Sequence, residues 1–247
     1  MIYLILLVLF FYTVMQFVET VSFGSRLAGK LVNRLSLGTT LQNSIYVSSR
    51  LFLPPLLIAL SYLIESGLRI EFFLNTSVAL VGAAFISSLI VLVKFNFFQS
   101  LFQYIFKQYD ESNSIPKAIL RLLFLRKKNK MKVINIESPP KIRALPLGKI
   151  IVSAFAYFFL STGFLISFSI AILIPEYRMT VSQLTTVFHG VGAIVLAMYI
   201  DPMICNSLDE NFKSDKWLEN VYSIFIGRLL AYILAFTVFL SLYSVVS

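Results

Sequence analysis

Four charged side chains fall inside stretches of sequence that are otherwise strongly apolar: those of Glu19, Arg50, Asp201 and Arg228. A charge at the centre of a bilayer costs about 2.5–3.5 kcal/mol on insertion scales, so such a side chain tends to face protein or a water-filled cavity. Two of the four are arginines, and a guanidinium group can bind phosphate through two parallel hydrogen bonds. These residue types therefore predict recognition of a phosphate-bearing group inside a membrane.

A simpler interpretation is that the charges form two internal ion pairs, Glu19 with Arg50 and Asp201 with Arg228, which would need no ligand. Counted along their helices, however, the two arginines lie roughly 13 Å deep, deeper than both carboxylates. We therefore favour a wet cavity that keeps both guanidinium groups available. Candidate cargo-binding residues are Arg26, Arg50, Arg228 and Asn43, and Glu19 and Asp201 are candidate charge partners or proton carriers.

Polar residues recur at helical spacing on two neighbouring segments, which predicts two helices that face this cavity. The residues on the first segment are Tyr12, Gln16, Glu19, Phe23, Arg26 and Lys30, and those on the second are Ser36, Thr40, Asn43, Arg50 and Pro54. Pro54 and Pro55 have no backbone N–H, so the carbonyls of Arg50 and Leu51 lose their helical partners. Unpaired carbonyls at that depth need protein or water nearby. We expect a hinge at the two prolines.

Small residues mark one side of a later segment, at Gly190, Ala193 and Ala197, and Asp201 continues the same line. Small residues at such intervals allow two membrane helices to approach closely. We expect this stripe to pack against a neighbouring helix and to carry Asp201 into the bundle.

Several kinds of chemistry are excluded. No G-x-x-x-x-G-K-[ST] run is present, so the chain carries no P-loop for ATP. His189 is the one histidine and Cys205 the one cysteine, which excludes H-E-x-x-H, a Cys cage and an internal disulfide. The carboxylates form no recognisable metal pattern. We expect no enzyme activity, no metal, no cofactor and no nucleic-acid partner.

The composition requires lipid as the solvent. Hydrophobic residues make up 58% of the 247 residues, against about 45–50% in soluble domains, and the mean hydropathy is +0.83. About 20 apolar residues in a helix cross the hydrocarbon core. We predict an all-α, polytopic helical bundle in one membrane domain, 1–247, and read Met1–Val18 as a retained span, not a signal peptide. The expected spans are 2–21, 41–64, 74–93, 150–174, 184–204 and 220–245.

The distribution of Lys and Arg predicts the orientation of the spans. Basic residues gather in the first, third and fifth loops, whereas the second and fourth contribute Arg69 and Arg178. The basic residues of the first and fifth loops are Arg26, Lys30, Arg34, Lys213 and Lys216. These odd-numbered loops are therefore expected in the cytoplasm and both termini outside.

The third loop, 94–149, is the longest and carries a basic cluster in Arg126–Lys132. We expect Lys94–Tyr109 to extend the third span along the interface and Ile115–Arg126 to form a short amphipathic helix, before Pro139, Pro140 and Pro146. The cluster has two interpretations: it binds anionic lipid, or it sets topology and links two spans. We favour the second.

Three stretches carry a more specific pattern. The first is ETVSFGSRLAGKLVNRLSL (Glu19–Leu37), continuing to SSRLFLPPLL; the second is PEYRMTVSQLTTVFHGVGAIVLAMYIDP (Pro175–Pro202); the third is NSLDENF, followed by IGRLLA around Arg228. In this order and spacing they resemble the Amj family of lipid II flippases, named as alternates to the flippase MurJ. The resemblance implies movement of undecaprenyl-diphosphate-linked disaccharide-pentapeptide from the inner to the outer leaflet of the bacterial cell membrane.

Two alternatives remain open. The chain could be a non-transporting membrane scaffold that recruits envelope proteins, in which case its function would reside in the basic loop. It could instead carry another polyprenyl-phosphate lipid, which differs only in the headgroup. The expected partners are lipid II or a related polyprenyl-diphosphate lipid, membrane lipids and cell-wall synthesis proteins.

Overall fold

The computed structural model describes residues 2–124, 145–209 and 216–246, and within these ranges the chain forms helices and no strand. Six segments of the described chain are long and apolar enough to cross a membrane, which confirms the predicted all-α, polytopic architecture. These segments are Ile2–Leu31, Leu35–Glu65, Ile70–Val93, Leu147–Leu173, Pro175–Ser207 and Trp217–Val246.

Four of the six segments are continuous helices: α1 (Ile2–Leu31), α4 (Ile70–Val93), α7 (Leu147–Leu173) and α11 (Lys216–Val246). The other two are interrupted. The second segment consists of α2 (Leu35–Ser49), a 3-10 turn (Arg50–Phe52) and α3 (Leu53–Glu65). The fifth consists of a 3-10 turn (Pro175–Tyr177), α8 (Arg178–Ser182), α9 (Leu184–Val195), a π-helical turn (Leu196–Ile200) and α10 (Asp201–Asp209).

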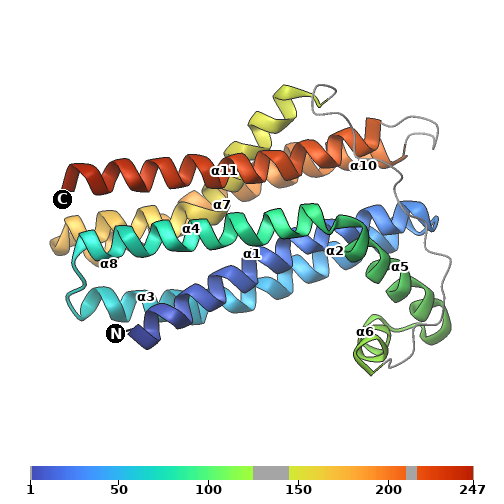
Figure 1. Ribbon diagram of the computed structural model, residues 1–247, viewed down its shortest axis with the longest axis horizontal. Coiled ribbons are helices and arrows are strands. Elements are labelled where there is room, and N and C mark those ends of the chain that lie inside the picture. The colour runs from blue at the N-terminus through green and yellow to red at the C-terminus, as the bar shows by residue number, and fades with distance from the viewer. Residues whose placement is uncertain (1, 125–144, 210–215, 247) are drawn as a thin grey trace.

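The helices pack one against the next in a series of contacts, and the two interrupted segments lie at the two ends of this series. Helix α1 packs on α2, α3 and α4, α4 packs on α11, α11 on α7, and α7 on α9. Among the described residues, α2 and α9 share no interface of comparable extent. Both chain ends lie at the same end of the bundle, away from α5 and α6 (Figure 1). Which side of the membrane this end faces stays a prediction.

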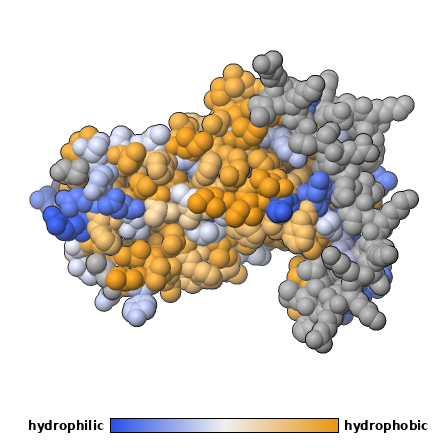
Figure 2. All heavy atoms as spheres, in the orientation of Figure 1, coloured by the Kyte–Doolittle hydropathy of each residue, from blue (hydrophilic) through white to orange (hydrophobic). Residues whose placement is uncertain are grey.

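The surface of the bundle matches a lipid environment. Figure 2 shows apolar residues spread over the middle of the visible face, with polar residues gathered toward the ends. Leu51, Ile58 and Met198 are among the large hydrophobic side chains that point outward. Water would disfavour such a surface, whereas lipid tails do not.

The chain between the third and fourth spans begins with two helices. Lys94 ends α4, and α5 (Phe95–Ser112) then packs on α1 by burying Gln99, Phe102 and Phe106. The expected amphipathic helix is present as α6 (Ile115–Phe124), which Figure 1 shows almost end-on, across the direction of the spans. The basic cluster Arg126–Lys132, together with Pro139 and Pro140, lies outside the described residues.

The first helix is longer than predicted, and this changes the place of two cations. Helix α1 continues to Leu31 instead of ending at residue 21, so Arg26 and Lys30 are buried helix residues, not loop residues. The chain then turns within three residues into α2. Gly29 and Gly38 permit this tight hairpin, because a Cβ on Gly38 would lie 2.7 Å from the Ser25 carbonyl oxygen. The close crossing brings the polar faces of α1 and α2 together.

Candidate functional site

One buried carboxylate joins the two arginines that the sequence singled out. Glu19 Oε1 lies 3.1 Å from Arg50 Nη2, and Glu19 Oε2 lies 3.2 Å from Arg228 Nη2. The three residues come from α1, from the 3-10 turn after α2, and from α11. Both arginines therefore belong to one cluster, and the Glu19–Arg50 pair expected under the ion-pair interpretation is present.

Arg228 is the most completely enclosed of the charged residues, with 2% of its surface exposed. Its Nε donates to the Tyr232 hydroxyl at 2.9 Å, and its Nη2 donates to Gln16 Oε1 at 2.7 Å. The guanidinium also lies over the Tyr157 ring, 4.8 Å from the ring centroid. Stacking and hydrogen bonds thus hold the guanidinium plane of Arg228 in one orientation.

Asp201 has a different partner from the one expected. Its Oδ1 lies 2.8 Å from Arg26 Nη2, so the predicted Asp201–Arg228 pair is wrong. The reason is the length of α1, which carries Arg26 into the bundle at the level of α10, while Glu19 occupies the Nη2 of Arg228. Glu19 nevertheless reaches both Arg50 and Arg228, and the relative depth of the arginines and the carboxylates in the membrane stays a prediction.

The small-residue stripe packs differently from the prediction. A Cβ on Gly190 would meet nothing within 4 Å, whereas a Cβ on Gly192 would lie 2.7 Å from the Ala156 carbonyl oxygen of α7. Helix α9 therefore contacts α7 through Gly192. Ala193 and Ala197 line a cavity.

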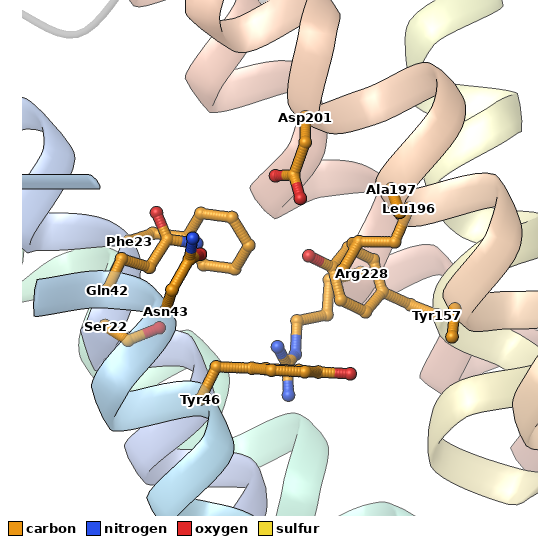
Figure 3. Close-up of a pocket in the computed structure, with 11 residues that line it drawn as sticks. Ser22, Phe23, Gln42, Asn43, Tyr46, Tyr157, Leu196, Ala197, Asp201 and Arg228 are labelled. Carbon is orange, nitrogen blue, oxygen red and sulfur yellow. The ribbon is translucent and has the colours of Figure 1, made fainter. Parts of the chain in front are cut away.

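This cavity has a volume of about 210 Å³ and lies between α1–α2 and the fifth segment. Figure 3 shows Gln42 and Asn43 on one side, Tyr157 on the other, and Asp201 pointing into the space between them. Of the four candidate cargo-binding residues, Asn43 and Arg228 line the cavity, whereas Arg26 and Arg50 are not part of the lining. Arg50 stacks on Tyr46, 4.5 Å from its ring centroid. The lining residues are Ser22, Phe23, Gln42, Asn43, Tyr46, Tyr157, Ala193, Leu196, Ala197, Asp201 and Arg228.

Hydrogen-bond donors are in excess around the cavity. Several buried donor atoms find no partner among the described residues: Gln16 Nε2, Arg26 Nε and Nη1, Arg50 Nη1 and the Tyr157 hydroxyl. Gln42 Oε1 is an unpartnered acceptor at the same place. Buried polar atoms in folded proteins are nearly always satisfied, so this group of donors points to an acceptor-rich ligand or water.

The charges of the cluster are also unbalanced. Arg26, Arg50 and Arg228 contribute three positive charges, and Glu19 and Asp201 contribute two negative charges, so the ion-paired cluster carries a net charge of +1. In the low dielectric of a membrane interior, this excess favours an anion more strongly than it would in water.

Both walls that flank the cavity are interrupted beside it. The 3-10 turn Arg50–Phe52 precedes Pro54 and Pro55, at the place where a break was expected. Opposite, the π-helical turn Leu196–Ile200 precedes Pro202. Such turns within helices are frequent at functional sites and mark places where a helix can bend. That the prolines act as a hinge stays a prediction.

Sequence reasoning missed the uncharged half of the site. Gln42, Tyr46 and Tyr157 line the cavity, and Tyr232 orients Arg228. Gln42 directly precedes Asn43 in the sequence, and Tyr46 follows Asn43 by three residues, about one helical turn. The helical spacing of α2 could therefore have indicated both. Tyr157 and Tyr232 sit in Phe-rich and Leu-rich helices, where nothing marks a tyrosine as different from a packed ring.

Comparison with known proteins adds one finding. The model of a family described as "Amj: Alternate to MurJ" matches residues 11–246, nearly the whole chain. No match was found to a curated protein or to a solved structure.

Proposed function

This chain belongs to the Amj family, and from that membership we propose that it flips lipid II from the cytoplasmic to the outer leaflet of the bacterial cell membrane. The observation that carries the proposal is the cluster of Arg50, Arg228 and Glu19, buried beside a cavity within a bundle of six membrane-length segments. The cargo would be an undecaprenyl diphosphate that bears the cell-wall disaccharide-pentapeptide.

The physical obstacle to flipping is the headgroup. A diphosphate that entered bare hydrocarbon would lose its hydration at a cost of tens of kcal/mol. Fixed donors along the path replace the lost water, and Arg228, Tyr157 and Asn43 supply such donors at the cavity. Because Arg228 and Tyr157 are buried and held in place by packing, they lose little freedom when they bind the anion.

The membrane potential would favour this direction of transport. Moving one charge across the membrane changes the free energy by about 2.3 kcal/mol per 100 mV. A diphosphate with two negative charges would therefore gain about 4.6 kcal/mol per 100 mV on moving out of a negative interior. The proposed transport thus needs no nucleotide, in keeping with the missing P-loop.

The conformation described here is a closed one. Pockets for drug-sized ligands measure about 300–1,000 Å³, and the cavity of about 210 Å³ cannot hold a disaccharide-pentapeptide. The Arg26–Asp201 pair joins α1 to α10. Toward the end that bears the termini, Arg178 Nη1 donates to the Ile64 carbonyl oxygen at 3.4 Å and joins α8 to α3. Alternate release of these two contacts would open the cavity first to one side and then to the other.

The polyprenyl tail need not enter the cavity. Helices α2 and α9 border it without an extended interface between them in the described chain. The outward side chains of α9 are apolar, among them Val191 and Ile194, whereas those of α2 are mostly polar, among them Thr40, Asn43 and Ser48. The tail can therefore stay in lipid along α9, while the polar residues of α2 face the headgroup as it crosses.

The test is complementation. The resident flippase is depleted in cells that express this chain, and lipid II exposed on the outer face is labelled. Wild type should expose lipid II, and Arg228→Gln should expose at least about tenfold less, since one lost charge-assisted contact is worth about 1.5–3 kcal/mol. Arg69→Gln, whose side chain is 80% exposed, is the matched control and should behave as wild type. Wild-type protein that inserts normally and exposes no lipid II would refute the proposal.

A carrier of another polyprenyl-phosphate lipid is the second candidate, because the donor-rich cluster recognises phosphate and not a particular sugar. The same assay separates the two candidates if undecaprenyl phosphate and lipid II are labelled in parallel.

A further inference from the structure

The role of Glu19 needs an explanation beyond that of a simple counter-ion. Its side chain is 5% exposed and lies between two cations that the proposed function assigns to the cargo. An aliphatic side chain at this place would leave both guanidinium groups free for phosphate. A carboxylate instead occupies the Nη2 atoms of Arg50 and Arg228, one oxygen on each.

The geometry of this contact resembles that of a bound phosphate. Two oxygens of one anionic group accept from two guanidinium groups at 3.1 Å and 3.2 Å, which are ordinary distances for charge-assisted hydrogen bonds. A phosphate group presents the same oxygens with more charge. It could also accept from Arg50 Nη1, a buried donor that has no partner among the described residues.

We propose that Glu19 is an internal substitute for the cargo diphosphate, which holds Arg50 and Arg228 in their binding positions between transport cycles and competes with the cargo for them. This inference rests on the proposed function. A diphosphate with two negative charges balances the two guanidinium groups by itself. Glu19 is then surplus negative charge and must leave them.

The structure provides a place for the displaced carboxylate. Ser49 Oγ already donates to Glu19 Oε1 at 3.3 Å. Gln16 lies three residues before Glu19 on α1, so the two share a helix face, and Gln16 Nε2 is a buried donor without a partner in the described chain. When the cargo leaves, Glu19 returns to the arginines and prevents it from rebinding. Competition by Glu19 therefore weakens cargo binding and speeds release.

The experiment measures binding of geranyl diphosphate, a short polyprenyl diphosphate, to the purified full-length protein in lipid nanodiscs. Glu19→Gln should bind this probe at least about tenfold more tightly than wild type, equivalent to about 1.4 kcal/mol, and should flip lipid II more slowly. Adding Arg228→Gln to Glu19→Gln should abolish the gain. Asp110→Asn removes an equal charge from the exposed Arg34–Asp110 pair, outside the cavity lining, and should change binding by less than about threefold.

The proposal is wrong if Glu19→Gln binds the probe no more tightly than wild type or no more tightly than Asp110→Asn. Should Glu19→Gln fail to accumulate, Glu19→Asp takes its place, because a shorter side chain cannot reach both arginines. Glu19→Asp should give a smaller gain in affinity for the probe, and no gain in affinity refutes the proposal. If wild type exposes lipid II and neither Glu19 variant gains affinity, the flippase stands and the role of Glu19 falls. If Glu19→Gln gains affinity and wild type exposes no lipid II, the anion site stands and the flippase falls.

Discussion

Loss of the Arg26–Asp201 pair should open the end of the cavity that lies away from the chain termini. Asp201→Asn removes the charge that faces Arg26 Nη2 at 2.8 Å. Two other nitrogens of Arg26, Nε and Nη1, already lack a partner among the described residues. The substitution therefore leaves a buried guanidinium without its ion pair, and separating α10 from α1 would rehydrate it.

The size of the effect follows from the burial of the two partners. Breaking a fully buried pair costs about 3–5 kcal/mol, and an exposed pair contributes about 0.2–1 kcal/mol. The Arg26 side chain is 3% exposed and that of Asp201 is 31% exposed, so we expect an intermediate loss of about 2–3 kcal/mol. A change of that size raises the ratio of open to closed molecules by about 30- to 150-fold.

Cys205, the one cysteine of the chain, reports this opening. It follows Asp201 by one turn of α10 and is half-buried. Its rate of reaction with a maleimide, measured in membranes by mass shift, should rise about 30- to 150-fold in Asp201→Asn. Asp110→Asn is the matched control, because it breaks the exposed Arg34–Asp110 pair and should change the rate less than twofold or so. An unchanged rate in Asp201→Asn would show that the pair does not hold the cavity closed.

Three further predictions concern packing, bending and the basic loop. Gly38→Ala should destabilise the protein by about 1–3 kcal/mol, since the new Cβ would lie 2.7 Å from a backbone oxygen of α1. Gly82→Ala should stabilise the protein by about 0.5–1 kcal/mol, because its Cβ would meet nothing within 4 Å. Thermal unfolding of the two variants measures both effects. Pro54→Ala with Pro55→Ala returns two backbone N–H donors to a segment in which the Arg50 carbonyl now accepts from Leu53 in the 3-10 turn, and should lower flipping without lowering the unfolding midpoint; equal flipping would contradict a hinge there. Neutralising Arg126–Lys132 should leave lipid II exposure within about threefold of wild type, whereas a scaffold that works through this loop would lose its function in the same complementation assay.

The fold was largely predictable because its signals are local. Stretches of about 20 apolar residues identify membrane spans one at a time, and missing N–H groups place the break near Pro54 without knowledge of any neighbour. Boundaries were less accurate where polar residues are buried. Helix α1 runs on through Arg26 and Lys30, which a hydropathy argument assigns to water and which the bundle encloses.

The partners of the charges were predictable only in part. The sequence predicted that Arg50 and Arg228 lie near each other and, under the ion-pair interpretation, that Glu19 pairs with Arg50, but not that Glu19 joins both arginines. Whether Asp201 reaches Arg228 or Arg26 depends on the tilt and length of α1, and a count of residues along separate spans carries no information on either. Tyr157 was missed because an uncharged polar residue in an apolar helix gives no signal until a cavity appears beside it.

A purely structural role explains this cluster poorly. Buried ion pairs add little net stability, and apolar residues of similar volume often serve a core equally well. A structural network would also satisfy its own hydrogen bonds, whereas Arg26, Arg50 and Tyr157 all keep buried donors without a partner in the described chain. The unmatched atoms are mainly donors, the excess charge is positive, and both flanking helices are interrupted. A movable site for an anion accounts for all three features together, because it needs spare donors, a positive balance and walls that can bend.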